Sequence, residues 1–108
     1  MTQKIEPDEL QHLQTQHNQP LIVDVRSEEE YLAGHVPGAI HIPLADLASR
    51  IGDLPQQTIV PYCNMFHPGS SRGEQARDLL QSHGLDARVL EGGFQGWKKA
   101  GLPVEEEL

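Results

Sequence analysis

Short apolar runs alternate along the chain with polar segments of helical character. The runs at 21–25 (Leu-Ile-Val-Asp-Val) and 58–62 (Thr-Ile-Val-Pro-Tyr) are rich in β-branched residues and almost wholly apolar, as buried strands of a parallel sheet are. Shorter runs at 39–42 and 87–90 predict two further strands. Pro61 lies inside the second run, although it has no N–H to offer a neighbouring strand. Either its N–H position faces an unpaired side of the sheet, or the strand bends just before residue 63.

Helices are predicted between these runs from their caps and their spacing. Pro7 and the acidic residues after it suit the first turn of a helix that ends before Asn18. Ser27 followed by Glu30 is a capping-box pattern, which starts a short helix through Ala33. Further helices are expected at 44–51, 73–83 and 94–100. Strands that alternate with helices predict an α/β domain with a mostly parallel sheet.

Length and charge exclude several classes of function. A chain of 108 residues is expected to form one domain, spanning 1–108. Acidic residues outnumber basic ones 16 to 8 and the net charge is -8, so the surface should repel the phosphates of nucleic acid. No apolar run reaches the length of a membrane span, and the first residues lack the apolar stretch of a secretory signal. The sequence therefore predicts no membrane partner and a cytoplasmic location, where a single cysteine without a disulfide partner is common.

Cys63 is the single cysteine, and it stands at the exit of the predicted strand 58–62. A loop follows it, and then the predicted helix 73–83. A strand, a loop and a helix N-terminus in this order direct backbone N–H groups and a helix dipole at the sulfur, which favours the thiolate and attracts anions. The alternative is a buried structural thiol, because free cysteines are often buried.

Several residues late in the loop suit an anion. The fork of the Arg72 guanidinium fits sulfonate or phosphate oxygens, unless it is only a solvated residue at the helix start. Ser70 and Ser71 could donate hydrogen bonds to the anion, or Ser71 could cap the helix. Gly69 is expected to allow a backbone conformation that other residues avoid, placing it at the substrate as well.

The early part of the loop is less usual in composition. His67 could protonate a leaving group or bind the anion when charged, although an exposed polar role is the common one for such a histidine. Met65 and Phe66 could form an apolar lip around the pocket or dock the loop on the body of the domain. Asn64 is counted with them among the candidate substrate-binding residues.

Four separated stretches together resemble the rhodanese-like domain family, and the resemblance covers nearly the whole chain. The stretches are 21–26, 28–43, 62–63 and 90–97, reading LIVDVR, EEEYLAGHVPGAIHIP, YC and LEGGFQGW. The resemblance implies a three-layer α/β/α domain with a parallel five-stranded sheet and helices on both faces. It also implies a sulfurtransferase whose cysteine holds a sulfane sulfur as a persulfide. Asp24 and Arg26 would then support neighbouring loops near the site.

The chain departs from the family in the loop itself. Eight residues separate Cys63 from Arg72, whereas the usual sulfurtransferase loop is shorter. Members that act on phosphate or arsenate have only slightly enlarged loops. Because loop size helps to select the anion, the resemblance leaves the substrate open.

The remaining polar residues suggest structural roles. His35 and His41 are expected to be hydrogen-bonded turn and strand residues, with His35 near the site. The histidines lack the close Cys/His pairing or His-x-x-x-His spacing of a metal site, so no metal and no cofactor are expected. The segment Gly92-Gly93-Phe94 is interpreted as a tight turn, because no lysine follows in a P-loop pattern.

Three functions follow from these observations. The first is a sulfurtransferase in which Cys63 takes sulfur from thiosulfate or a persulfide donor and passes it to cyanide or a thiol. The second is a non-catalytic interaction or regulatory module that uses the long loop to contact a partner protein. The third is a cysteine-dependent phosphatase or arsenate reductase, for which the loop before Arg72 is long.

Overall fold

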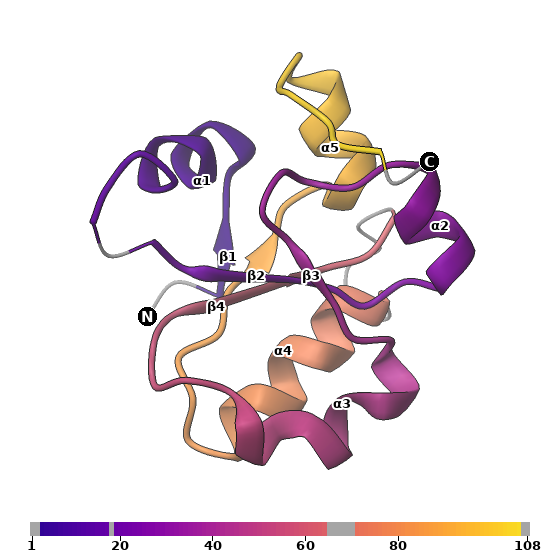
Figure 1. Cartoon of the computed structure of the whole chain (residues 1–108). Coiled ribbons are helices and arrows are strands. Elements are labelled where there is room, and N and C mark those ends of the chain that lie inside the picture. The colour runs from indigo at the N-terminus through magenta and orange to yellow at the C-terminus, as the bar shows by residue number, and fades with distance from the viewer. Residues whose placement is uncertain (1–2, 18, 65–70, 107–108) are drawn as a thin grey trace.

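The computed structural model describes residues 3–17, 19–64 and 71–106. Parallel strands form a central layer with helices above and below it (Figure 1). The strands are β1 (Lys4–Ile5), β2 (Leu21–Asp24), β3 (Ile40–His41), β4 (Ile59–Tyr62) and β5 (Val89–Leu90). The helices are α1 (Pro7–Leu13), α2 (Glu28–Ala33), α3 (Leu44–Arg50), α4 (Arg72–Ser82) and α5 (Gly93–Lys99), with a 3₁₀ turn η1 (Ile51–Asp53) after α3.

The strands form two hydrogen-bonded groups. One group has the order β3-β2-β4 and the other pairs β1 with β5, and all these pairs are parallel. A single parallel bridge between Ile59 and Ala87 joins the two groups. The expected α/β fold is confirmed, with the five strands divided in this way.

Pro61 explains the division. On β4 the N–H of Ile59 donates to the Asp86 carbonyl, and the Ile59 carbonyl accepts from the N–H of Arg88. The next residue of β4 that faces this side is Pro61, since every second residue of a strand points its N–H the same way, and it has no hydrogen to donate. Pro61 meets β2 only through its register with Val23. The first of the two alternatives given by the sequence therefore applies.

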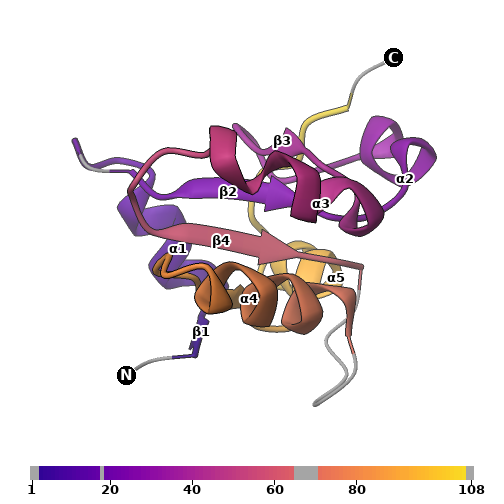
Figure 2. The same ribbon diagram turned by 90° about the horizontal axis from the view of Figure 1, so that it is seen from below.

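Alternating side chains of the central strands create two cores. Val23 and Ile59 face the layer of α3 and α4, while Ile22 and Val60 face the layer of α1 and α5. The period of two is the strand periodicity. The first core contains Leu47 and Leu80 among others, and the second contains Leu10, Phe94 and Trp97. Figure 2 shows β2 and β4 running in the same direction, with α3 and α4 in front of them.

The capping pattern of Ser27 and Glu30 correctly predicts the start of α2. Ser27 accepts from the N–H of Glu30, and the Glu30 carboxylate accepts from the N–H of Ser27, which is a complete capping box. Strand β1 is not predicted from the sequence, because Ile5 is flanked by polar residues and belongs to no apolar run, unlike β3 and β5. Among the described residues no helix is long and apolar enough to cross a membrane.

Candidate active site

Cys63 directly follows β4, and its side chain belongs to the core beneath α3 and α4. The residue is 5% exposed. Gly73, in the first turn of α4, lies against it: a Cβ at position 73 would be 3.4 Å from the backbone nitrogen of Cys63 and 2.9 Å from Cγ2 of Val89. A glycine thus lets the start of α4 approach the cysteine closely. Burial is typical of structural thiols, and the close approach of the α4 start is what the reactive alternative expects.

The start of α5 holds the backbone around the cysteine. The N–H of Phe94 donates to the Cys63 carbonyl at 2.8 Å, and the N–H of Gln95 donates to the Asn64 carbonyl at 2.9 Å. Gly93 has φ +59°, and a Cβ there would lie 2.6 Å from the Cys63 carbonyl oxygen. Only glycine fits this left-handed position at that separation. The turn at Gly92-Gly93 therefore positions the start of α5 against the Cys63 carbonyl.

A second capping box begins α4. The Ser71 hydroxyl accepts from the N–H of Glu74, and Oε1 of Glu74 accepts from both the N–H and the hydroxyl of Ser71. Glu74 is buried, at 8% exposure. The Ser71 hydroxyl, a candidate donor to substrate, is engaged in the cap. The Glu74 carboxylate therefore lies at the N-terminus of α4, where the sequence predicts that the helix dipole attracts an anion.

The Arg72 side chain forms an ion pair with Glu30. Its Nη1 and Nη2 contact the two carboxylate oxygens of Glu30 on α2, at 3.1 and 3.4 Å. Partial burial favours the neutral form of Glu30, but hydrogen bonds from Arg72 and Ser27 outweigh it and lower the pKa of Glu30 to about 2. Glu30 is therefore ionised at neutral pH. The ion pair joins the start of α2 to the start of α4.

A buried polar network lies at the end of β2 and includes Tyr62, the residue before the cysteine. The Arg26 guanidinium donates to the Asp24 carboxylate, with Nη2 at 2.6 Å, and to the Gly34 carbonyl. The Tyr62 hydroxyl donates to Asp24 at 2.8 Å and accepts from the N–H of Val36. Burial and then the Asp24 charge raise the pKa of Tyr62 well above its ordinary value. Burial lowers the pKa of Arg26, but hydrogen bonding and the charge of Asp24 outweigh it and raise the pKa overall.

His35 and His41 belong to a stacked group around Tyr31. The Tyr31 ring stacks on His35 at 4.0 Å and on His41 at 4.8 Å between centroids. Nδ1 of His35 contacts the Tyr31 carbonyl, and Nε2 of His41 contacts the Arg26 carbonyl. The chain near the C-terminus covers His35 through reciprocal backbone hydrogen bonds with Glu105. These contacts place both histidines in the framework around the site.

The comparison with known families decides the identity of this arrangement. The family model described as "Rhodanese-like domain" matches residues 6–100. The chain belongs to the rhodanese-like domain family.

Individual relatives agree with this assignment. A thiosulfate sulfurtransferase of Pseudomonas fluorescens is 35% identical over 98 residues, covering 88% of this rhodanese-like chain and 84% of the relative. An HTH-type transcriptional regulator of Mycobacterium tuberculosis is 42% identical over 86 residues, covering 79% of the chain. The solution structure of the rhodanese-like domain of the Alr3790 protein from Anabaena sp. has a TM-score of 0.81 at 30% identity, covering 98% of this chain and 80% of that one. The chain spans only 37% and 54% of the length of two curated relatives.

The structure brings some predicted site residues of this rhodanese-like domain together. Cys63, Asn64, Ser71 and Arg72 lie at the ends of β4 and α4. Asp24, Arg26 and His35 make other contacts: Asp24 and Arg26 pair with each other, and His35 stacks on Tyr31. The predictions for Met65, Phe66, His67, Gly69 and Ser70 lie outside the described residues.

Three residues that contact the site, Gly93, Glu74 and Glu30, are not among the site residues predicted from the sequence. Gly93 and Glu74 had local signals, namely a double glycine before a helix and the Ser-x-x-Glu spacing from Ser71. Glu30 was recognised as part of a cap, but its pairing with Arg72 had no local signal, because the two lie 42 positions apart.

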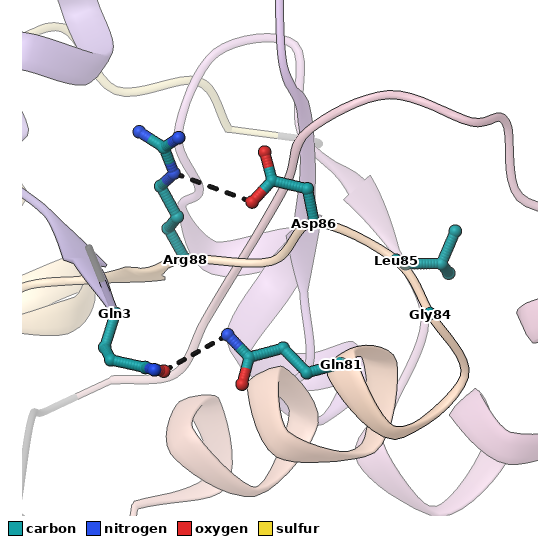
Figure 3. Close-up of a pocket in the computed structure, with 6 residues that line it drawn as sticks. All are labelled: Gln3, Gln81, Gly84, Leu85, Asp86 and Arg88. Carbon is teal, nitrogen blue, oxygen red and sulfur yellow. Dashed lines mark hydrogen bonds and ion pairs between the residues drawn. The ribbon is translucent and has the colours of Figure 1, made fainter. Parts of the chain in front are cut away.

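A separate pocket lies at the opposite end of α4 from Cys63. It measures about 510 Å³ and is drawn in Figure 3. Gln81 donates there to the side chain of Gln3, and Arg88 lies 3.7 Å from Asp86. None of the candidate site residues lines this pocket.

Proposed function

We propose that this rhodanese-like domain is a sulfurtransferase that carries a sulfane sulfur on Cys63. The observation that carries the proposal is the position of Cys63 at the end of β4, where Gly73 lets the start of α4 approach and α5 holds the adjoining carbonyls. The sulfurtransferase of P. fluorescens that resembles the chain supports the same reaction class. A small sulfur-containing anion or a persulfide would be the donor, and a thiol or cyanide the acceptor.

The reaction is a double displacement at sulfur. The Cys63 thiolate attacks the outer sulfur of the donor, forming a new S–S bond while the donor's own bond to that sulfur breaks. Sulfite or a donor thiolate leaves with the electron pair. An acceptor thiolate or cyanide then attacks the outer sulfur of the persulfide, and Cys63 departs as a thiolate. No net oxidant is required, and backbone N–H groups would stabilise the anions.

Intact-protein mass spectrometry tests the proposal. After incubation with thiosulfate or cysteine persulfide, the protein should gain the mass of one sulfur atom, which a thiol acceptor then removes. The variant Cys63→Ser should gain none while keeping the native circular dichroism spectrum. An unmodified native protein with both donors would contradict the proposal, as would sulfur gained by Cys63→Ser.

A regulatory module is the second candidate. It is favoured by the resemblance to a transcriptional regulator, of which the chain spans 37%. Such a module would bind a partner protein and would show no sulfur transfer with any donor. Turnover of an aryl phosphate would instead favour the phosphatase alternative. The cytoplasmic location and the single domain expected from the sequence stay predictions.

A further inference from the structure

The pocket at the end of α4 away from Cys63 has the size and the lining of a small-molecule site. Its volume of about 510 Å³ lies within the range of known ligand pockets. Most of its lining side chains are polar, and the lining residues are Gln3, Gln81, Gly84, Leu85, Asp86 and Arg88 (Figure 3). The pocket is thus separate from the site proposed for sulfur transfer.

Asp86 and Arg88 form an ion pair at this pocket that is not closed by a hydrogen bond. Nε of Arg88 lies 3.7 Å from Oδ1 of Asp86, whereas an N–H···O hydrogen bond spans about 2.7–3.2 Å. This Nε is buried, and no described residue is its hydrogen-bond partner. Oδ2 of Asp86 accepts from the Thr58 hydroxyl. The Arg88 and Asp86 side chains are 34% and 47% exposed, so a ligand can reach both ions, and both keep unused hydrogen-bonding capacity.

The two glutamines of the pocket leave one donor group and one acceptor unused. Nε2 of Gln81 donates to Oε1 of Gln3 and to the Ala87 carbonyl, which uses both of its hydrogens. Within the described part of the chain, Oε1 of Gln81 and Nε2 of Gln3 have no hydrogen-bond partner. A carboxamide has an acceptor oxygen and a donor nitrogen side by side. It is therefore complementary to what the glutamine pair leaves unused.

The charges at the pocket favour a ligand that carries both signs. An anion alone would give Arg88 an acceptor but would be repelled by the Asp86 carboxylate, and a cation alone would be repelled by the guanidinium. Arg77 donates to the Gln3 carbonyl beside the pocket, but it pairs with Asp78 and adds no unmatched charge. The carboxylate and the ammonium group of a free α-amino acid are attached to one carbon atom. They match a guanidinium and a carboxylate that lie this close together.

We propose that this pocket binds a free α-amino acid whose side chain ends in a carboxamide. The Arg88 guanidinium holds the α-carboxylate and the Asp86 carboxylate holds the α-ammonium group. The pair of Gln3 and Gln81 receives the side-chain amide. No covalent bond is made or broken, and the site does not depend on the proposed sulfur transfer at Cys63.

The first test compares ligands that differ by one group. L-Glutamine is titrated into the ¹⁵N-labelled protein, and NMR follows the backbone amides of residues 84–88 and the side-chain amides of Gln3 and Gln81. These signals should shift and saturate. N-Acetyl-L-glutamine lacks the ammonium charge, L-glutamine amide lacks the carboxylate, and L-methionine lacks the carboxamide. Each of the first two should bind at least about tenfold more weakly than L-glutamine, because a charge-assisted contact is lost. L-Methionine should bind about threefold to tenfold more weakly, because it loses neutral hydrogen bonds.

The second test removes the two charges of the protein in turn. Arg88→Gln and Asp86→Asn should each weaken L-glutamine binding at least about tenfold. Asparagine keeps an acceptor for the Thr58 hydroxyl, so the local fold should remain, and circular dichroism checks this for each variant. Arg50→Gln and Asp53→Asn are the matched controls, because both residues are exposed and neither lines the pocket. The controls should bind L-glutamine as the native protein does.

The outcomes distinguish this site from the cysteine and from weaker assignments. Signals that do not shift with L-glutamine would overturn the proposal, as would unchanged binding by folded Arg88→Gln and Asp86→Asn. Equal affinities for L-glutamine and N-acetyl-L-glutamine would reduce the pocket to a carboxylate site and overturn the part assigned to Asp86. Equal affinity for L-methionine would overturn the part assigned to the glutamine pair. Cys63→Ser should bind L-glutamine with the native affinity, and a loss in this variant would place the binding at the cysteine instead.

Discussion

Two arginines at the same edge of the sheet are held in opposite ways. Arg26 is 3% exposed, donates to Asp24 and to the Gly34 carbonyl, and lies 4.5 Å above the Phe94 ring. The side chain of Arg72 is 41% exposed and pairs with Glu30, itself about one-third exposed. Both arginines form guanidinium–carboxylate pairs, but the Arg26 pair is buried and the Arg72 pair is partly exposed to solvent.

The difference assigns the two pairs to different tasks. A buried charge that loses its partner has no water to replace it, so the Asp24–Arg26 pair must stay closed and acts as framework. A solvated pair is close to neutral in free energy and can exchange partners. The Glu30–Arg72 pair is therefore the one that an anion can open.

The same substitution in both arginines tests the difference between the two pairs most directly. Arg26→Gln leaves Asp24 buried without its cation and should lower the free energy of unfolding by about 3–5 kcal/mol. Arg72→Gln should lower it by less than about 1 kcal/mol. Urea denaturation at neutral pH measures both, and similar losses for the two variants would show that exposure does not separate the pairs.

Removing one hydroxyl should weaken the buried network to a smaller extent. Tyr62→Phe deletes the donor to Asp24 and leaves the Val36 N–H without that acceptor, which should cost about 2 kcal/mol. Tyr31→Phe is the control, because its hydroxyl donates to a partly buried carbonyl of Ala39; its loss should be about 0.5–1 kcal/mol. Equal midpoints of urea unfolding for the two variants would show that the hydrogen bonds of the Tyr62 hydroxyl contribute no more to the free energy of unfolding than that of the Tyr31 hydroxyl.

Acid should remove the contribution of the exposed pair. Because the pKa of Glu30 is lowered to about 2 from its usual 4.5, its contribution is fully present above about pH 4.5 and disappears as the pH falls through about 2. Native protein should exceed Glu30→Gln by about 0.5 kcal/mol at pH 7, since the pair is solvated. The two should converge near pH 2 in urea titrations. A constant difference across this range would mean that Glu30 acts without its charge.

Salt should produce the smallest of these effects. A double-mutant cycle of Glu30→Gln and Arg72→Gln should give a coupling of about 0.3–0.5 kcal/mol at low ionic strength, and 1 M salt should screen most of it. The loss caused by Arg26→Gln should hardly depend on salt, because buried pairs are screened much less. A coupling that survives high salt would place Arg72 and Glu30 in a drier environment.

Local signals account for what the sequence predicted well. The helix of residues 28–33 was expected from Ser27 and Glu30, whose hydrogen bonds close within one turn. Strand β4 was expected from its continuous apolar run. By contrast, Lys4 and Ile5 pair with Val89 and Leu90 at the other end of the chain. Ile5 stands among polar residues, so its own segment has no strand pattern.

The same distinction applies to the site. The position of Cys63 follows from the order of strand, loop and helix, which is a local property. The partner of Arg72 depends on how α2 packs beside α4, so no spacing within either segment indicates Glu30. The Ser71–Glu74 cap is visible as a local pattern, but the close approach of α4 to Cys63 that Gly73 allows is not.

Pro61 determines which part of the sheet should unfold first in a local fluctuation. Because its ring interrupts pairing on one side of β4, the edge formed by β1 and β5 is attached to the other three strands by one bridge and by side-chain packing. This edge can detach in a local fluctuation that leaves β2, β3 and β4 paired. Deuterium would then enter the amides of Ile5 and Glu91 sooner than that of Val25. The amide hydrogens of β4, the strand before Cys63, would exchange last.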